Sequence, residues 1–399
     1  MRSYRIGRLF GIPIELDLTF LVVLPLFAYL IGSSVGTYAE LLNEQFGAGL
    51  DVAALSGDPV VAFTLGALAA VGLFVGVVLH ELGHSLVAMR FGFPIASITL
   101  WLFGGVAQLS EMPEDWKQEL YIALAGPAVS VALGVVSYGA FTLVDPNGSA
   151  LLAGTRFLLG YLALMNVVLA VFNLLPGFPM DGGRVLRALL ARTRPYARAT
   201  QLAAEVGKLF AILLGLFGLF GGGGLFLVAI AFFIYIGASS EAQQTMMKAA
   251  FEGVVVRDVM TPREEVKAVA PDTSVADLVE RMFRERHTGY PVLDAGRVVG
   301  VVTLSDAQSV DEVERDAFTV EEVMTRELET IGPDEDAIDA LQRMQSTGVG
   351  RLLVMDGEDL VGIISRTDLM TALDIVRESG SLQAENRDPE TMASSDRPA

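Results

Sequence analysis

The chain contains no cysteine and only three histidines, which narrows the chemistry open to it. Without cysteine it can form neither disulfides nor thiolate metal sites, so any metal ion must be held by histidine and carboxylate groups. Basic residues are also scarce: 28 Lys and Arg stand against 47 Asp and Glu, a formal net charge of −19. Because nucleic-acid binding needs a basic face, we expect no nucleic-acid partner.

The two parts of the chain differ in composition. Hydrophobic residues make up 52% of the sequence, and its mean hydropathy is +0.50. Residues 1–240 carry 12 Lys and Arg and 14 Asp and Glu, whereas residues 241–399 carry 16 and 33. The apolar runs long enough to cross a bilayer all lie in the first part. We therefore predict a polytopic α-helical membrane protein whose C-terminal part is soluble and acidic.

Six transmembrane helices are expected, near residues 17–36, 60–88, 118–143, 155–175, 203–220 and 223–239. Basic residues precede the first helix and occur after the second and the fourth, whereas the loops at 37–59 and 144–154 contain no Lys or Arg. Because cytoplasmic loops are enriched in Lys and Arg, this distribution predicts a multi-pass protein of the cell membrane with both termini in the cytoplasm.

An internal repeat occupies the soluble part. Residues 256–261 (VRDVMT) recur as 320–325 (VEEVMT), and residues 300–306 (GVVTLSD) recur as 362–368 (GIISRTD). Short β-branched segments alternate with charged, helix-like ones, which is typical of an α/β fold. The resulting domain plan is a membrane domain at 1–240, a linker at 241–253, two repeat units at 254–310 and 317–375, and a disordered tail at 376–399.

The second predicted helix ends on a metal-binding pattern at residues 80–84 (HELGH). His80 and His84 lie one turn apart on a helix, so both can bind one Zn²⁺, and Glu81 can act as general base on a metal-bound water. The alternative is a helix end with incidental polar residues at the membrane surface. At 1.5 Å per residue, however, His80 lies about 15 Å before Arg90 and thus inside the membrane, where ionisable groups are functional by default.

A catalytic zinc usually has three protein ligands, so a carboxylate on another helix is expected. Asp17 opens the first predicted helix and fits an interfacial position better. Asp181 lies in residues 173–183 (NLLPGFPMDGG), whose prolines and glycines cannot continue a helix. Irregular backbone at membrane depth survives only where protein or a water-filled cavity covers it, so Asp181 is the preferred third ligand, with a plain turn as the alternative.

These motifs resemble those of the site-2 protease family of intramembrane metalloproteases, in the branch that carries CBS pairs. Residues 80–84 match its zinc motif, and N-x-x-P-x-x-P-x-D-G at 173–182 is similar to its second motif. Residues 102–105 (LFGG) and 125–127 (AGP) resemble two shorter family signatures. The resemblance implies one Zn²⁺ per chain on His80, His84 and Asp181, and hydrolysis of peptide bonds in or near transmembrane segments, with Glu81 handling the proton.

Two further substrate contacts are expected from the same comparison. Asn173 could donate a hydrogen bond to the substrate carbonyl or the oxyanion, or else cap the broken helix. Residues 96–109 suit a hairpin around Gly104 and Gly105, whose free edge could pair with an unwound substrate or simply pack. The partners predicted here are therefore transmembrane proteins and the lipid bilayer.

The repeat resembles a tandem CBS domain. In that family, Gly-x-x-Ser/Thr-x-x-Asp places a hydroxyl and a carboxylate near an adenine nucleotide, a pattern matched by Thr303 with Asp306 and by Ser365 with Asp368. Other such modules only dimerise, so an adenine nucleotide ligand and a homodimer are both open.

Two different functions remain as alternatives. One is a CBS-gated transporter or channel, in which the intramembrane His and Asp residues would form an ion site. The other is a catalytically idle homologue that only binds membrane partners, against which the intact Glu81 argues. Metal content separates the protease from the carrier, and turnover separates it from the idle homologue.

Overall fold

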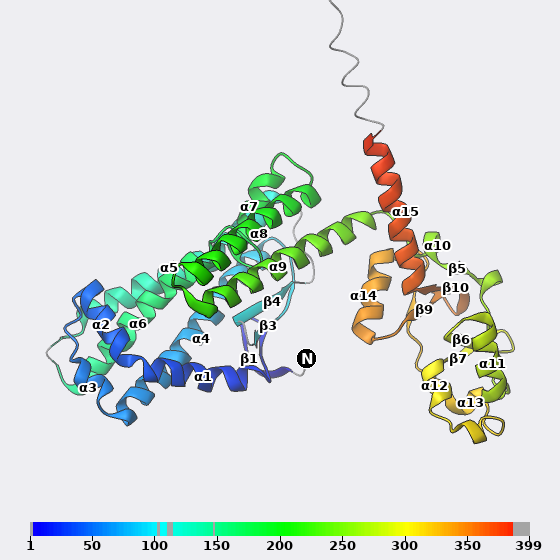
Figure 1. Cartoon of the computed structure of the whole chain (residues 1–399), viewed down its shortest axis with the longest axis horizontal. Helices are drawn as coiled ribbons and strands as arrows, with labels where there is room; N and C mark the ends of the chain where they lie inside the picture. Colours follow the sequence, from blue (N-terminus) through cyan, green and yellow to red (C-terminus); the bar gives the residue numbers. More distant parts are fainter. Residues whose placement is uncertain (1–2, 102–103, 110–114, 147, 386–399) are drawn as a thin grey trace, which may run out of the picture. The chain divides into compact units, whose positions relative to one another are not determined.

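The computed structural model describes residues 3–101, 104–109, 115–146 and 148–385. The chain forms two compact units, Met1–Thr245 and Met246–Ala399 (Figure 1). The first is a bundle of long helices with one small sheet, and the second combines short helices with two sheets. We refer to them as the membrane unit and the CBS unit.

Among the described residues, five helices are long and apolar enough to cross a bilayer: α4 (Pro59–Arg90), α5 (Trp116–Leu143), α6 (Ala150–Asn173), α8 (Tyr196–Phe220) and α9 (Gly224–Ala250). A bent pair, α1 (Phe20–Ser33) and α2 (Val35–Phe46), adds a sixth candidate span. The predicted polytopic membrane fold is confirmed: six spans were predicted, and the described residues supply five candidates, or six if the bent pair is one span. Two short helices, α3 (Val52–Ser56) and α7 (Asp181–Ala191), complete the helical part.

The first span differs from the prediction of one helix over 17–36. Helix α1 has 14 residues, and the chain turns by 63° into α2 because Ser34 leaves helical geometry (φ −112°, ψ 10°). Helix α1 lies very close to α4: a Cβ atom at Gly66 would lie 2.5 Å from the carbonyl oxygen of Ala28. Glycine is required at this crossing, and the predicted loop at 37–59 is largely helical.

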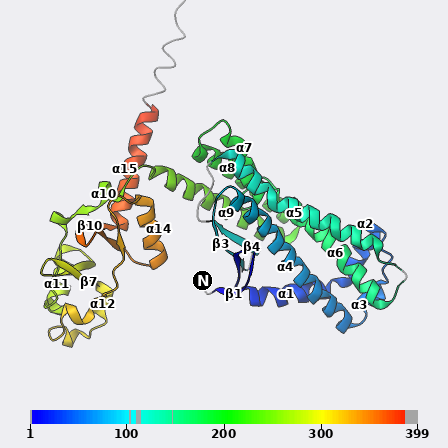
Figure 2. The same ribbon diagram turned by 180° about the vertical axis from the view of Figure 1, so that it is seen from behind.

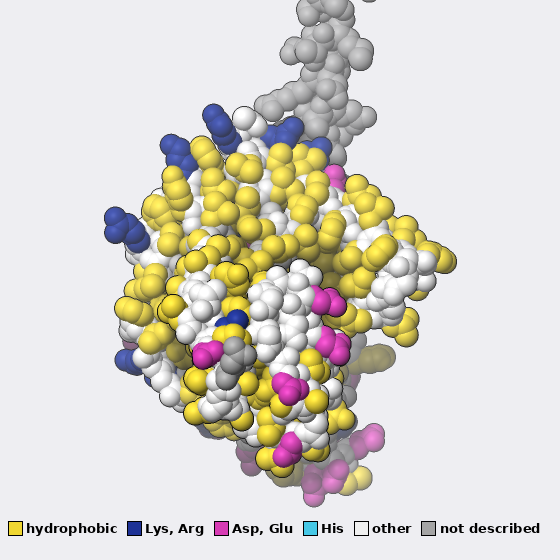
Figure 3. Space-filling view, turned by 90° about the vertical axis from the view of Figure 1, so that its left-hand side faces the viewer, with side chains coloured by type: hydrophobic (Ala, Val, Ile, Leu, Met, Phe, Trp, Pro, Cys, Tyr) yellow, Lys and Arg dark blue, Asp and Glu magenta, His cyan; other side chains and the backbone are white. Residues whose placement is uncertain are grey.

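The outer surface of the membrane unit is apolar. Figure 3 shows hydrophobic side chains over much of the surface in view, with acidic side chains gathered on the face toward the viewer. Single side chains are almost fully exposed on several helices, including Leu151 at 79%, Phe220 at 84% and Leu225 at 81%. Apolar surfaces of this extent are not stable in water, and they fit contact with lipid.

A four-stranded sheet packs against α4, with the order β1 (Ser3–Leu9), β2 (Ile12–Asp17), β3 (Ile95–Trp101) and β4 (Gly104–Leu109). The first two strands were not predicted. They form a hairpin around Phe10 and Gly11, which both have positive φ (52° and 86°), as tight hairpin turns require. Strands β3 and β4 form the predicted hairpin beside α4 (Figure 2), and β4 is an edge strand.

The CBS unit shows the repeat directly. The first repeat contains α10 (Val256–Val259), β5 (Thr261–Pro262), a 3₁₀ turn at Arg263–Glu265, α11 (Val275–Glu285), β6 (Gly289–Asp294), β7 (Arg297–Thr303) and α12 (Leu304–Gln308). After a 3₁₀ turn at Glu312–Glu314, the second contains α13 (Val320–Val323), β8 (Thr330–Ile331), α14 (Ala337–Thr347), β9 (Arg351–Asp356), β10 (Asp359–Ser365) and α15 (Arg366–Glu385).

The two repeats exchange their leading segments. Strand β5 of the first repeat pairs with β10 of the second, and Thr325 of the second forms a bridge with Val301 of the first. The cores follow the same exchange, because Val256 is buried with the second repeat and Val320 with the first. This reciprocal pairing makes one pseudo-symmetric α/β domain, as the tandem CBS resemblance predicted.

Two segments are more ordered than the sequence suggested. Helix α9 continues to Ala250, through most of the segment 241–253 that we predicted as a linker. Helix α15 continues to Glu385, into the predicted tail 376–399, of which residues 386–399 lie outside the described residues.

Candidate metal centre

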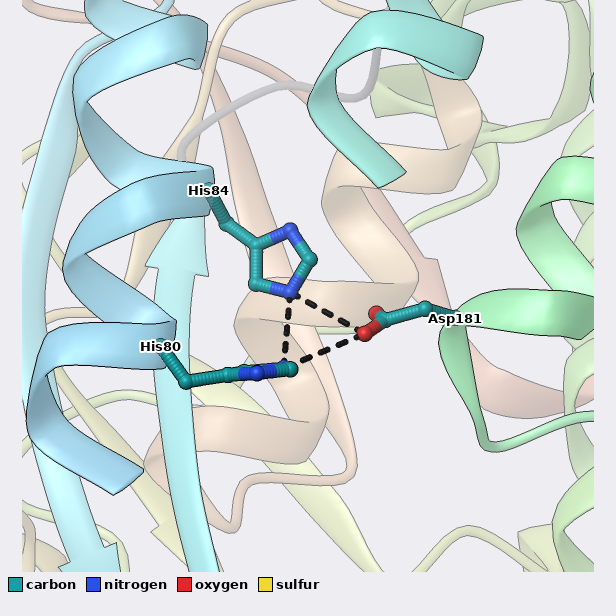
Figure 4. A group of neighbouring side chains, drawn as sticks. All are labelled: His80, His84 and Asp181. Carbon is teal, nitrogen blue, oxygen red and sulfur yellow. Dashed lines mark hydrogen bonds and ion pairs between the residues drawn. The ribbon is translucent and has the colours of Figure 1, made fainter. Parts of the chain in front are cut away.

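Three predicted ligand side chains meet inside the membrane unit. The Nε2 atoms of His80 and His84 are 3.2 Å apart, and Oδ2 of Asp181 lies 3.2 Å from the first and 3.1 Å from the second. Figure 4 shows the two imidazoles extending from one side of α4 toward the carboxylate at the start of α7. All three residues are at least 91% buried. The structure thus brings together the predicted ligand set.

Helix α4 places the two histidines on one face. Asp58 caps its first turn through a 2.8 Å bond from the amide of Val60, and Pro59 occupies the first turn, where its missing N–H costs nothing. The helix continues without a break to Arg90, so His80 and His84 keep the one-turn spacing that a shared ion requires.

The chain break after α6 positions Asp181. Helix α6 ends at Asn173, and the next helix begins at Asp181 itself. Two glycines fix the junction: Cβ atoms would lie 2.1 Å from the carbonyl oxygen of Leu175 at Gly182 and 2.6 Å from the amide nitrogen of Phe178 at Gly183. Helix α7 therefore packs directly on the backbone of the preceding turn, and the carboxylate is held at the end of that rigid corner.

Hydrogen bonds to the far ring nitrogens determine what the site can bind. Nδ1 of His84 lies 2.7 Å from the carbonyl oxygen of Ile122, which can only accept, so this nitrogen carries a proton. In a neutral ring Nε2 of His84 then presents a lone pair. Nδ1 of His80 lies 2.8 Å from Oγ of Ser130, which can accept in the same way. Two imidazole lone pairs and a carboxylate that converge in this manner form a donor set that can hold a metal ion.

The spacing of the three atoms fits zinc. Zinc ligands at about 2.0–2.1 Å in tetrahedral geometry lie roughly 3.3 Å from one another. The observed separations are 3.1–3.2 Å. Two imidazoles and one carboxylate are also an ordinary donor set for a catalytic zinc, with a fourth position left open.

Helix α5 contributes a residue whose role the sequence did not reveal. A Cβ atom at Gly126 would lie 2.1 Å from Nε2 of His84 and 2.7 Å from Nε2 of His80. Any side chain here would fill the space in front of both lone pairs. Gly126 belongs to the short signature at 125–127, for which the sequence indicated no function. The close approach of α5 to α4 shows that Gly126 leaves room beside the two imidazoles.

Glu81 lies against the edge strand. A Cβ atom at Gly105 would lie 2.6 Å from Cγ of Glu81, so glycine lets β4 pass directly over the predicted general base. Gly104 has a φ of +125°, which side chains rarely adopt. The two glycines thus shape the strand beside Glu81, whereas Leu102 and Phe103 of the same motif lie outside the described residues.

Asn173, a predicted substrate contact, is the last residue of helix α6. Its side-chain amide donates a 3.0 Å hydrogen bond to the carbonyl oxygen of Leu169, in its own helix. This contact corresponds to the structural role that the sequence left open beside substrate binding.

The two Ser/Thr–Asp pairs of the CBS unit cap helices. Thr303 donates to Oδ2 of Asp306 from its amide and its hydroxyl, both at 2.7 Å, at the start of α12. Ser365 and Asp368 repeat this arrangement at α15, at 2.9 and 2.7 Å. Nearby, Arg351 reaches across from the second repeat to Thr288 of the first at 3.2 Å. Partial burial lowers the pKa of its guanidinium, against the opposing effect of Asp368.

Comparison with known proteins identifies both parts of the chain. The family model "Peptidase family M50" matches residues 68–146 and 139–214, and the model "CBS domain" matches residues 256–310 and 320–375. Zinc metalloprotease MJ0392 of Methanocaldococcus jannaschii is 35% identical over 94% of this chain and 97% of its own length. Rip3 of Mycobacterium tuberculosis is 34% identical over 93% of each chain.

A solved structure is also similar: the site-2 protease from Methanocaldococcus jannaschii covers 60% of this chain and 95% of its own, with 36% identity and a TM-score of 0.40. Family membership decides between the enzyme and the CBS-gated carrier that the sequence left open. The His-His-Asp cluster beside Glu81, on helices long enough to span a bilayer, agrees with it. The chain belongs to peptidase family M50, the site-2 protease family of zinc metalloproteases, and carries a pair of CBS domains.

Proposed function

We propose that this zinc metalloprotease cleaves peptide bonds in or near the transmembrane segments of membrane proteins, and that its CBS pair modulates this activity. The observation that carries the proposal is the position of the metal site on α4. His80 follows an apolar stretch with no charged residue from Pro59 to Leu79, about 32 Å of helix. Such a site is suited to a substrate that is itself in the bilayer.

The chain's own residues account for the proton transfers. His80, His84 and Asp181 would hold the zinc, which when bound polarises the scissile carbonyl and lowers the pKa of an attacking water. Glu81 accepts the proton from that water and delivers it to the leaving amine. The contact of Glu81 with Gly105 fixes where this exchange takes place, directly beside strand β4.

Strand β4 is the proposed platform for the substrate. A transmembrane helix hides its amides in its own hydrogen bonds, so it must unwind locally before cleavage. An edge strand offers backbone groups to such an unwound segment, which would place its scissile bond next to Glu81. Asn173 would reach a substrate carbonyl only after giving up its bond to Leu169.

The arrangement in the cell is proposed from charge. The basic residues near the ends of the predicted spans favour a cytoplasmic position for both termini and the CBS unit, with the enzyme in the cell membrane. The metal site is nearer to Arg90 than to Pro59 on α4, and hence nearer to the cytoplasmic side. We therefore expect cleavage to release a cytoplasmic fragment of the substrate.

The proposed ligand of the CBS pair is an adenine nucleotide. The Asp306 and Asp368 carboxylates each keep a second oxygen beyond the one that caps the helix, which could accept from ribose hydroxyls. Titration calorimetry of the full chain with AMP and with ATP tests binding, and mass measurement in detergent tests a homodimer.

Zinc content and cleavage together test the protease. In detergent, the full chain should contain about one zinc and cleave a single-span model substrate. The Glu81→Gln variant should keep the zinc but lose cleavage by roughly 10²–10⁴-fold, the usual contribution of a general base. Glu205→Gln, at an exposed position of α8, is the matched control. Wild-type protein without zinc, or full cleavage by Glu81→Gln, would refute the mechanism.

A further inference from the structure

The two metal-binding histidines have different partners at their Nδ1 atoms. His84 faces the carbonyl oxygen of Ile122, which can only accept a hydrogen bond, so its tautomer is fixed. His80 faces the hydroxyl of Ser130, which can either accept or donate. If Ser130 donated to a neutral ring, Nε2 of His80 would carry the proton and could not bind a metal ion. A further group must therefore accept the hydroxyl proton of Ser130.

Helix α6 carries a buried acceptor that lacks a partner. Asn166 is 4% exposed, and its side-chain amide donates a 2.9 Å hydrogen bond to the carbonyl oxygen of Leu162, in its own helix. Its Oδ1 atom has no hydrogen-bond partner within the part of the chain that the structure describes. A buried polar atom of this kind is costly, and in native proteins it usually marks a bound water or a functional role.

Two glycines place Asn166 next to the contact between His80 and Ser130. A Cβ atom at Gly76 of α4 would lie 3.1 Å from Oδ1 of Asn166, and one at Gly134 of α5 would lie 3.8 Å from its Cβ. Gly76 lies one turn before His80, and Gly134 lies one turn after Ser130. The contacts of the two metal-binding histidines with α5 show that α4 and α5 run antiparallel. Both turns therefore lead in the same direction, toward Asn166.

The spacing of one turn suits a single water molecule. A helical turn rises by about 5.4 Å, and a water that bonds to two oxygen atoms at about 2.8 Å from each spans roughly 5.6 Å. Buried waters typically bind beside polar groups that otherwise lack a partner. The hydrogen bonds then run in one direction, from Nδ1 of His80 to Ser130, from Ser130 to the water, and from the water to Oδ1 of Asn166. Because an amide oxygen can only accept, it fixes the direction of every bond before it.

We propose that Asn166 is a positioning residue of the metal centre, which holds an internal water against Ser130 and thereby keeps the Nε2 lone pair of His80 directed at the metal position. The inference rests on the zinc site of the proposed function and adds a residue that is neither a ligand nor a general base. A purely structural asparagine would behave differently. Because its Oδ1 atom has no partner, its replacement by leucine would stabilise the fold and leave zinc binding unchanged.

Zinc affinity measures the effect, by competition with a chelator on the full chain in detergent. Asn166→Leu is close in size and should weaken zinc binding by about tenfold, the lower end of the range for outer partners of metal ligands. Asn166→Asp keeps an acceptor oxygen and should retain most of the affinity. Thr155→Val is the matched control, because Thr155 lies on the same helix and its hydroxyl also bonds to a carbonyl oxygen of that helix. This control should bind zinc as the wild type does.

A double variant separates the hydrogen-bond chain from a general effect on packing. Ser130→Ala already breaks the chain at its first member, so the addition of Asn166→Leu should weaken zinc binding no further. Independent effects on packing would instead multiply, and the double variant would bind zinc about tenfold more weakly than Ser130→Ala alone.

The small number of histidines allows the ring protons to be observed directly by nuclear magnetic resonance. In zinc-loaded protein with isotope-labelled histidine, only His80, His84 and His287 give ring signals. Asn166→Leu should shift the Nδ1–H signal of His80. The signal of His84 should stay in place, because that nitrogen bonds to a backbone carbonyl oxygen. A variant that merely packed less well would not select one ring over the other.

Zinc affinity of Asn166→Leu equal to that of the wild type would overturn the inference and leave the protease intact. Effects that multiply in the double variant, or an unmoved His80 signal, would also overturn it. Absence of zinc from the wild-type protein would instead refute the proposed function, and the inference with it.

Discussion

Replacing Gly126 with alanine adds one methyl group at the most crowded point of the metal centre. Its carbon would lie 2.1 Å from Nε2 of His84, whereas contacts below 3.0 Å essentially never occur. The imidazole or helix α5 must therefore move by roughly 1 Å, which exceeds the tolerance of about 0.2 Å in zinc–ligand distances. We expect zinc affinity to fall by roughly 100-fold, the upper end of the range for disturbed outer-sphere partners.

The assay is competition with a chelator of known affinity, on full-length protein in detergent. The fold should be preserved, because alanine is a better helix former than glycine by up to about 1 kcal/mol. Gly139→Ala is the matched control: Gly139 lies on the same helix, and a Cβ atom there would have no neighbour within 4 Å. Zinc affinity of Gly126→Ala equal to that of Gly139→Ala would refute the close approach of α5 to the histidines.

Three further substitutions test separate parts of the structure. Ser130→Ala removes the partner of His80 Nδ1 and should weaken zinc binding by about 10–100-fold; unchanged affinity would count against the bond. Arg156→Met removes the buried guanidinium that donates to the carbonyl oxygens of Ala48, Phe141 and Val144, so it should lower thermal stability by about 3 kcal/mol while zinc content stays the same. Thr303→Ala removes the cap of α12 and should cost about 1 kcal/mol in thermal unfolding, an effect that a purely ligand-binding threonine would not produce.

The metal ligands were predictable because their signals are local. The spacing of His80 and His84 is meaningful on any helix, and the prolines and glycines before Asp181 mark a break at membrane depth. The scarcity of histidine and the absence of cysteine then left few other ligand sets. The repeat in the C-terminal part was predictable for a similar reason. A recurring sequence pattern predicts two similar structural units, and it can be recognised without knowledge of distant contacts.

The parts that escaped prediction depend on tertiary contacts. The N-terminal hairpin is too short and too mixed in composition to stand out, and it is stable because Ile12 and Ile14 pack with Leu82 of α4. The bend at Ser34 interrupts a segment that is apolar on both sides. Helix α9 continues through most of the expected linker because Met247 and Ala250 pack against the core of the second repeat, a contact that charge and hydropathy do not indicate.

The metal ligands could be predicted from the sequence, but the glycines that shape the site could not. The ligands act through their side chains, and side-chain chemistry can be recognised from residue type and spacing. Gly105 and Gly126 act because they have no side chain, which lets β4 approach Glu81 and α5 approach the imidazoles. A glycine in a membrane helix serves equally well for close packing, as Gly66 does between α1 and α4. Only the approach of a second element distinguishes a glycine that packs helices from one that leaves room for a metal ion.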